Sequence, residues 1–352
     1  MAYTTIAKPS DHFDVPKWTG SSSTTTITGL SFKPASIWIK RYDGSGHPLL
    51  NNSSEGTGQN WIPSGNNAND TNTLVASYTS DGFTLTGGGA DVNENGENHI
   101  AACWKVADGT ESTNNVGSIS ATVQANTTSG VAICRYTGTG ANGTIGHGLG
   151  AVPKVIIGKT TTLADRGDWY IGDTKFYSDT ETDLIQFAST GQFQDDAGGW
   201  NDTKPTSTVW SIGNKTHHNT SGAPCIAYVF AEVQGFSKMG MYMGNGDTQG
   251  TFTHCGFRPK WIMIKKWDGT EDWFVKSTVV DSGQLANDGE LKRTLKFSDN
   301  SSNTNCTVNV TAHGFYPATT DGKANLSGAV YLYMAFAEFP SVGTNGTVGL
   351  AI

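Results

Sequence analysis

The polar residues that could support chemistry are sparse along this chain. The stretch Asp91-Val-Asn93-Glu-Asn95-Gly96 matches the first half of an EF-hand loop, but Ala102 stands where the bidentate glutamate is required. A turn explains that stretch better than a calcium site. The acidic loop 194–202 offers carboxylate oxygens, although a solvated loop explains it equally well. We therefore expect no metal ion and no other cofactor.

Histidine and cysteine give no ligand set. His217 and His218 are adjacent, and adjacent residues of a strand point to opposite faces, so we expect no shared metal. The five cysteines are widely spaced without a C-x-x-C motif, so neither a zinc site nor a disulfide framework is indicated. Those in apolar runs are expected to be small buried hydrophobic residues: Cys103, Cys134 and Cys225.

The motifs of common catalytic sites do not occur in the chain. We find no nucleophile elbow, phosphate-binding loop, zinc-protease helix or dinucleotide-binding fingerprint. A pair of glycosidase carboxylates could still meet in space rather than in sequence, which leaves a polysaccharide-degrading enzyme as a disfavoured alternative. We therefore expect a protein that is not an enzyme.

Three tryptophans in unrepeated polar contexts are the candidate ligand-binding residues. Trp61 lies in a long polar loop, Trp200 in the acidic loop and Trp267 beside Asp268 at a strand end. An exposed indole among amide and carboxylate groups suits sugar binding, because its face stacks on C–H groups while the polar groups bond hydroxyls. The alternative is that each tryptophan folds back and holds its own loop.

Composition excludes several classes and favours an all-β protein. Of the 352 residues, 15 % are charged and 44 are glycine, and the net charge is −8 without basic clusters. Nucleic-acid binding is therefore not expected, and no apolar run is long enough for membrane insertion by a helix. The many β-branched residues and turn formers predict short antiparallel strands in β-sandwich, jelly-roll-like domains.

Two signatures recur three times. The first is a proline, an apolar run and a lysine: Pro34 to Lys40, Pro153 to Lys159 and Pro259 to Lys265. The second is Asn-x-x-Gly before an apolar run: Asn93 and Gly96, Asn219 and Gly222, Asn325 and Gly328. Residues present in every copy belong more naturally to a scaffold than to one site. We expect the prolines to start edge-compatible strands and the lysines to solvate strand ends.

The repeat of roughly 105–125 residues has the size of a domain, so each copy could bury its own core. We predict three tandem homologous β-sandwich domains at 11–107, 118–235 and 236–340. Residues 108–117 read as a polar linker, 341–352 as a C-terminal tail, and 1–10 as an extended N-terminal arm ordered only by a neighbouring protein.

Residues 135–159, 242–275 and 331–340 resemble a repeat family found in tail-associated and other structural proteins of marine bacteriophages. The first copy departs from it, with Trp18 where the others have tyrosine and without the Asp-Trp pair of Asp168-Trp169 and Asp272-Trp273. The resemblance implies a virion protein built from β-rich modules and implies no catalytic residue.

Together these observations predict a bacteriophage virion structural protein, a tail or tail-fibre component that contacts the host surface. The expected partners are other virion proteins, further copies of the chain and a host-surface glycan. No secretion signal begins the sequence, so assembly into the virion in the host cytoplasm is expected. A capsid decoration or head-spike protein is the first alternative, and a carbohydrate-binding module array is the second.

Overall fold

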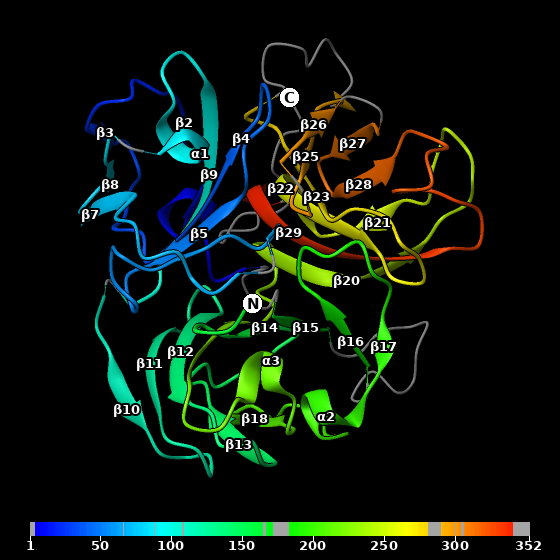
Figure 1. Cartoon of the computed structure of the whole chain (residues 1–352). Coiled ribbons are helices and arrows are strands. Elements are labelled where there is room, and N and C mark those ends of the chain that lie inside the picture. Colours follow the sequence, from blue (N-terminus) through cyan, green and yellow to red (C-terminus); the bar gives the residue numbers. More distant parts are fainter. Residues whose placement is uncertain are drawn as a thin grey trace.

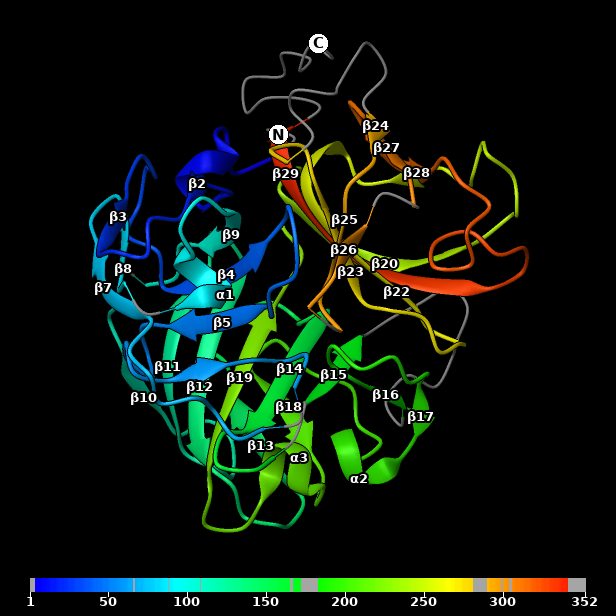
Figure 2. The same ribbon diagram turned by 45° about the horizontal axis from the view of Figure 1, so that its top comes forward.

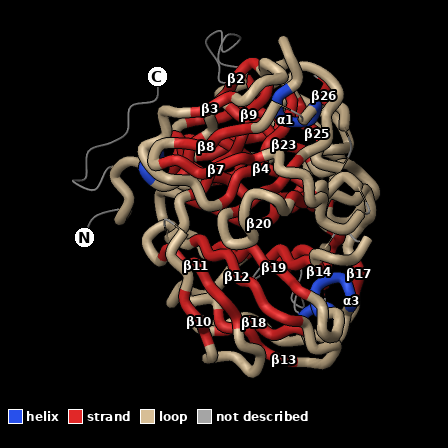
Figure 3. Tube along the Cα trace, turned by 60° about the vertical axis from the view of Figure 1, so that its left-hand side comes forward, coloured by secondary structure: helices blue, strands red, loops and turns tan. Residues whose placement is uncertain are grey.

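A computed structural model describes residues 4–340 except 66, 88, 108, 165–166, 172–182, 281–289, 299 and 304–305. Strands dominate it, which confirms the all-β class (Figures 1 and 3). The helices in this part of the chain are single turns: η1 (Pro9–Asp11), α1 (Ala90–Asn93), α2 (Ala197–Trp200) and α3 (Thr216–Asn219). No described helix combines the length and the apolar character needed to span a bilayer.

Each repeated segment contributes one large antiparallel sheet. The first contains β1 (Phe13–Asp14), β2 (Lys17–Thr19), β4 (Ser36–Arg41), β5 (Leu49–Asn52), β6 (Asn60–Trp61) and β9 (Asn98–Trp104). The second contains β10 (Ser112–Asn114), β11 (Ala121–Asn126), β12 (Val131–Thr137), β14 (Val155–Thr160), β15 (Asp168–Ile171), β16 (Asp183–Gln186), β17 (Gln194–Asp195) and β19 (Pro224–Phe230). The third contains β20 (Ser237–Met243), β22 (Phe257–Lys266), β23 (Phe274–Ser277), β25 (Thr294–Lys296), β26 (Ser302–Asn303) and β29 (Val330–Pro340).

A smaller sheet covers one face of each large sheet. In the first segment it consists of β3 (Thr25–Ile27), β7 (Val75–Thr79) and β8 (Gly82–Leu85). In the second it consists of β13 (Gly143–Gly146) and β18 (Val209–Ile212). In the third it consists of β21 (Thr253–His254), β24 (Glu290–Leu291), β27 (Val308–Thr311) and β28 (Gly314–Pro317). Buried apolar side chains fill the space between the two sheets of each segment.

The apolar runs that follow Asn-x-x-Gly form the corresponding strands β9, β19 and β29. Each lies between the same two neighbours, β2, β12 or β20 on one side and β4, β14 or β22 on the other. Because side chains alternate along a strand, these runs present two faces. Ala101, Val229 and Ala335 face the small sheet of their own segment.

The opposite faces of the three strands meet in a single central core. Trp104, Phe230 and Phe336 occupy corresponding positions, and their ring centroids lie 5.4 to 6.2 Å apart. The core around them draws buried residues from all three segments. In Figures 1 and 2 the blue, green and orange segments surround this common centre. Each segment keeps a core of its own between its two sheets, but the segments are not independent of one another, because one face of every large sheet is buried in a core that all three share.

The segments are also joined in a closed cycle by polar contacts at corresponding carbonyl groups. Asn69 N of the first segment donates to Thr161 O of the second at 2.8 Å. Phe193 N of the second donates to Trp267 O of the third at 3.0 Å. Arg293 Nη1 of the third donates to Tyr42 O of the first at 2.7 Å. The third segment thus returns to the first, and no segment stands at a free end.

Two predicted connecting regions are also integrated into this body. Ile6 is buried in the central core, so the described part of the N-terminal arm packs on its own chain. Within the predicted linker, Ser112–Asn114 forms edge strand β10 by pairing with β11. The predicted tail 341–352 lies outside the described residues.

The shared core predicts cooperative unfolding. Phe230→Ala and Phe336→Ala should each lower the free energy of unfolding by ~3–5 kcal/mol, through lost burial and a cavity. Both rings lie in the core that the three segments share. Urea unfolding should therefore show a single transition, with the same midpoint by tryptophan fluorescence and by circular dichroism. Phe252→Ala, at a ring that is 50 % exposed, is the matched control and should change stability little. Separate transitions, with one segment lost first, would contradict a shared core.

Candidate functional site

The repeated asparagines and glycines hold the scaffold at corresponding turns. Asn93 is fully buried, its Oδ1 accepts from Ser21 N at 3.1 Å, and its Nδ2 donates to Ser23 O and Thr86 O. Asn219 and Asn325 make the corresponding bonds. The glycines of the signature have φ angles near +80°, which favour glycine, and each donates to the carbonyl of the glycine that directly follows β2, β12 or β20: Gly96, Gly222 and Gly328.

The repeated lysines and prolines do not lie where the sequence suggested. Lys159 is buried, and its Nζ donates to Leu163 O and to Asn67 O of the first segment. Lys265 likewise reaches Gly269 O and Thr190 O of the second segment, and Lys40 is buried against Gly46 O. The solvated-lysine expectation is wrong because each ammonium group bonds loop carbonyls.

The strands that follow the prolines are interior rather than edge strands. β4, β14 and β22 each pair with a neighbour on both sides. Pro34 and Pro153 precede the paired residues, while Pro259 lies at a register shift inside β22. A proline without an N–H is accommodated at both kinds of position, so the edge-strand expectation is wrong.

The three candidate tryptophans are buried, which overturns their prediction as exposed sugar platforms. Trp61 is 2 % exposed in the central core, with its ring 5.2 Å from that of Phe187. Trp267 is 0 % exposed and stacks on Phe193 at 5.1 Å. Trp200 is 2 % exposed in the core of the second segment. Trp61 and Trp267 pack against rings of another segment, a contact that the polar residues beside them in sequence do not reveal.

A polar cluster that does not repeat lies inside the second segment. Asp168 of β15 is fully buried and accepts from two rings, His217 Nδ1 at 3.1 Å and His218 Nδ1 at 2.9 Å. The histidines lie on α3 rather than on a strand, so their side chains can converge on one carboxylate. The expectation that they diverge is wrong for this reason. In the described part of the chain, no three His, Cys, Asp or Glu side chains are arranged so that they could hold a metal ion.

This cluster replaces apolar residues of the other copies. Asp168 pairs with Gly158 at the register where Leu49 pairs with Ile39 and Phe274 pairs with Ile264. His218 takes the place of Val92 and Ala324, counted from the signature asparagine. A Cβ atom at Gly158 would lie 3.1 Å from the Cβ atom of His218. Gly158 therefore makes the room that the histidine needs.

The second nitrogen of His218 bonds the backbone. His218 Nε2 lies 3.0 Å from Gly199 O, and the ring stacks on Trp200 at 4.7 Å. A carbonyl oxygen only accepts, so both ring nitrogens act as donors and the ring forms an ion pair with the carboxylate. Burial alone would raise the pKa of Asp168, but hydrogen bonds from His217 and His218 outweigh it and lower the pKa to about 2. The geometry suits a buried structural ion pair.

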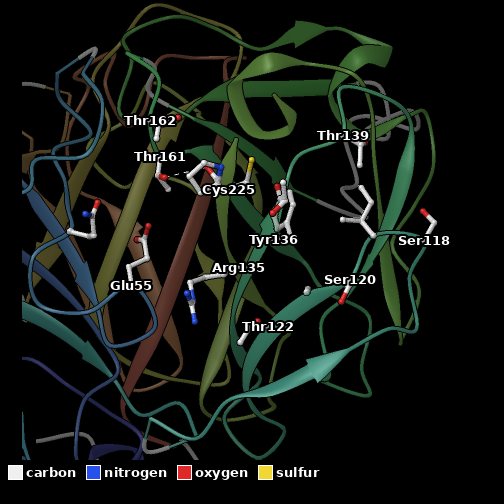
Figure 4. A pocket seen from close by; sticks show the side chains of 15 residues that line it. Glu55, Ser118, Ser120, Thr122, Arg135, Tyr136, Thr139, Thr161, Thr162 and Cys225 are labelled. Atoms are coloured by element: carbon white, nitrogen blue, oxygen red, sulfur yellow. Dashed lines mark hydrogen bonds between the residues drawn. The ribbon is translucent and has the colours of Figure 1, made fainter. Parts of the chain in front are cut away.

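A groove of about 810 Å³ lies between the first and second segments, and it is the candidate binding site (Figure 4). One wall is the β5–β6 loop of the first segment, with Glu55 and Gln59. The other wall comes from β11, β12, the start of β19 and the residues that follow β14. Figure 4 shows Glu55 and Arg135 at one end of the groove, and hydroxyl side chains along its length: Ser118, Ser120, Thr122, Thr139, Thr161 and Thr162.

The electrostatics of the groove centre on its two charged residues. Burial raises the pKa of Glu55 to about 7, against the opposing effects of the Asn52 hydrogen bond and of the positive charge of Arg135. Arg135 Nη2 forms an ion pair with Glu111 at 2.8 Å. Arg135 is thereby largely neutralised, and the groove carries little net charge. Sequence reasoning missed Glu55 because nothing in its polar loop shows that it faces another segment.

The five cysteines are unpaired and buried, which confirms the interpretation of Cys103, Cys134 and Cys225 as small buried residues. None lies within a group of metal-ligating residues in the described ranges. Cys225 also lines the groove, beside Thr161. Burial raises the pKa of its thiol, which suits a packing role rather than a nucleophile.

The chain is thus a threefold-repeated, all-β protein with a groove between two of its segments. The chain belongs to the family described as a domain of unknown function, DUF7483, whose model matches residues 8–340. No curated protein matches the chain, and no solved structure does.

The buried ion pair generates a stability prediction. Asp168→Asn should lower the free energy of unfolding by ~3–5 kcal/mol at pH 7, because it leaves a buried imidazolium group without its carboxylate. The folded pKa of Asp168 lies below its ordinary value of 3.8. Its contribution is therefore present above pH 3.8 and lost as the pH falls toward 2. Urea unfolding between pH 2 and 7 should show a weaker acid dependence in the variant.

The other segments supply the control for that experiment. The double variant Asp168→Leu, His218→Val introduces the residues found at the corresponding positions 49 and 92. It should lose less stability than Asp168→Asn alone, because removing both charges leaves neither unpaired. Equal losses in the two variants would show that the pair contributes only packing.

Proposed function

We propose that this protein is a non-enzymatic structural component of a bacteriophage particle, located in the tail or tail fibre, where it contacts the host surface. The observation that carries the proposal is the resemblance of residues 135–159, 242–275 and 331–340 to a repeat family of phage structural proteins. Other virion proteins and further copies of the chain are its proposed partners. It enters the particle during assembly in the host cytoplasm.

The fold is compatible with such a role. Every repeated residue named above serves the scaffold, through the buried asparagines, the buried lysines and the ring contacts of the central core. The closed cycle of contacts between segments makes one body from three copies. A particle component must keep its shape under mechanical and solvent stress, and a body whose segments each contact the other two meets that need.

The proposal predicts where the protein is found. Gold-labelled antibodies against the full chain should bind the tails of intact purified particles in electron micrographs, and mass spectrometry of the same particles should detect the chain. Antibodies first absorbed with the purified protein provide the control. Label over the capsid would instead favour a decoration or head-spike protein. Absence from purified particles, with the protein present in infected cells, would contradict a virion role.

A further inference from the structure

The groove between the first and second segments is lined by polar side chains of the kind that bind ligands. It is composite, because Glu55 comes from one segment and Arg135 from another. We propose that this groove binds a neutral oligosaccharide, whose vicinal hydroxyl groups hydrogen-bond the Glu55 carboxylate and the Arg135 guanidinium. The binding property goes beyond a place in the particle and can be tested on the isolated protein.

The lining of the groove matches a polyhydroxylated ligand. Carboxylate, guanidinium, amide and hydroxyl groups can each donate to or accept from sugar hydroxyls. The exposed ring of Pro224 provides an apolar surface against which C–H groups can pack. A ligand without hydroxyl groups would leave this many polar side chains dehydrated and unpaired, which costs binding free energy.

Glu55 is held in place before any ligand arrives. Asn52 Oδ1 accepts from Glu55 N at 2.9 Å, and Asn52 Nδ2 donates to Glu55 Oε2 at 2.8 Å. The same amide group donates to the Tyr228 hydroxyl of the second segment at 2.9 Å. The buried Asn52 thus fixes the carboxylate and ties its loop to the opposite segment. A carboxylate held in this way loses little conformational freedom on binding.

Arg135 keeps bonding capacity for a ligand. Its Nη2 is engaged by Glu111, but the side chain as a whole is 39 % exposed and lines the groove. The exposed part of the guanidinium group can therefore donate to a ligand hydroxyl. Because Glu111 already balances the guanidinium charge, an anionic ligand would meet the Glu55 carboxylate without a free counter-charge. This balance favours a neutral sugar over a uronate or a phosphate.

Binding can be measured with the full-length chain on an array of neutral hexose oligosaccharides and oligouronates, followed by titration calorimetry with the array hits. We expect retention of at least one neutral oligosaccharide and no preference for the uronates. Glu55→Gln, which keeps the shape of the side chain, should weaken binding of that sugar at least tenfold.

A pair of bulky substitutions tests the location. Thr122→Trp places an indole in the groove, and Ser207→Trp places the same group at an exposed position outside it. Thr122→Trp should abolish binding while Ser207→Trp leaves it unchanged, with circular dichroism and thermal melting showing both variants folded.

Several results would overturn the proposal. Binding of no neutral oligosaccharide, binding of uronates alone, or equal binding by Thr122→Trp and Ser207→Trp would each do so. If Thr122→Trp fails to fold, Glu55→Gln decides the question, since unchanged affinity in that variant excludes the groove. These outcomes are separate from the labelling of particles, because a particle protein without a sugar site would still be found on the virion.

Discussion

The contact among Trp104, Phe230 and Phe336 is the interaction on which the rest of the molecule depends. Each ring comes from the corresponding position of a repeated strand, and each strand is apolar on both faces. One face is covered by the small sheet of the same segment. The other face of the strand can be buried only by a different segment, because its own segment has no third layer to cover it. Association of the three copies is therefore a condition of burying the core.

The same constraint explains why polar side chains are buried at the segment boundaries. Loops that meet beside a shared core bring backbone carbonyls out of water, and these need donors. Lys159 and Lys265 supply them by reaching into the preceding segment, and the backbone groups of Asn69 and Phe193 do so directly. The buried lysines thus help to join the segments, although in the sequence each looks like a polar residue at the end of a strand.

Local signals were sufficient to predict the strands and the turns between them. The Asn-x-x-Gly signature marks turns whose asparagine and positive-φ glycine are needed in each copy, and the apolar runs after it are central strands. The sequence could not show what buries the second face of those runs. Burial against another segment and burial within a larger sandwich both require apolar residues there. Trp61 illustrates the limit. Its neighbours in sequence are polar, but its neighbours in space are Phe187 and Tyr228 of the second segment.

The adjacent histidines show a different limit, which concerns local geometry. On a strand His217 and His218 would diverge, but the single turn of α3 brings both nitrogens to Asp168. Their partner lies on β15, and its importance becomes visible only when it is compared with Leu49 and Phe274 at the same register.

A repeated fold allows such comparisons within one chain, because corresponding positions of the three copies must be filled in the same structural surroundings. Two copies solve it with apolar side chains, and the second uses an ion pair together with Gly158 to make room for it. Dehydrating a charged pair gives less stability than apolar packing of similar volume, so stability alone does not account for the exchange. The groove also lies along the second segment, and Tyr136 on its wall donates to His218 O at 2.6 Å. The third segment makes the same bond, from the Tyr242 hydroxyl to Ala324 O at 2.8 Å, so this bond belongs to the repeat, whereas the contact between Asp168 and His218 distinguishes the second segment.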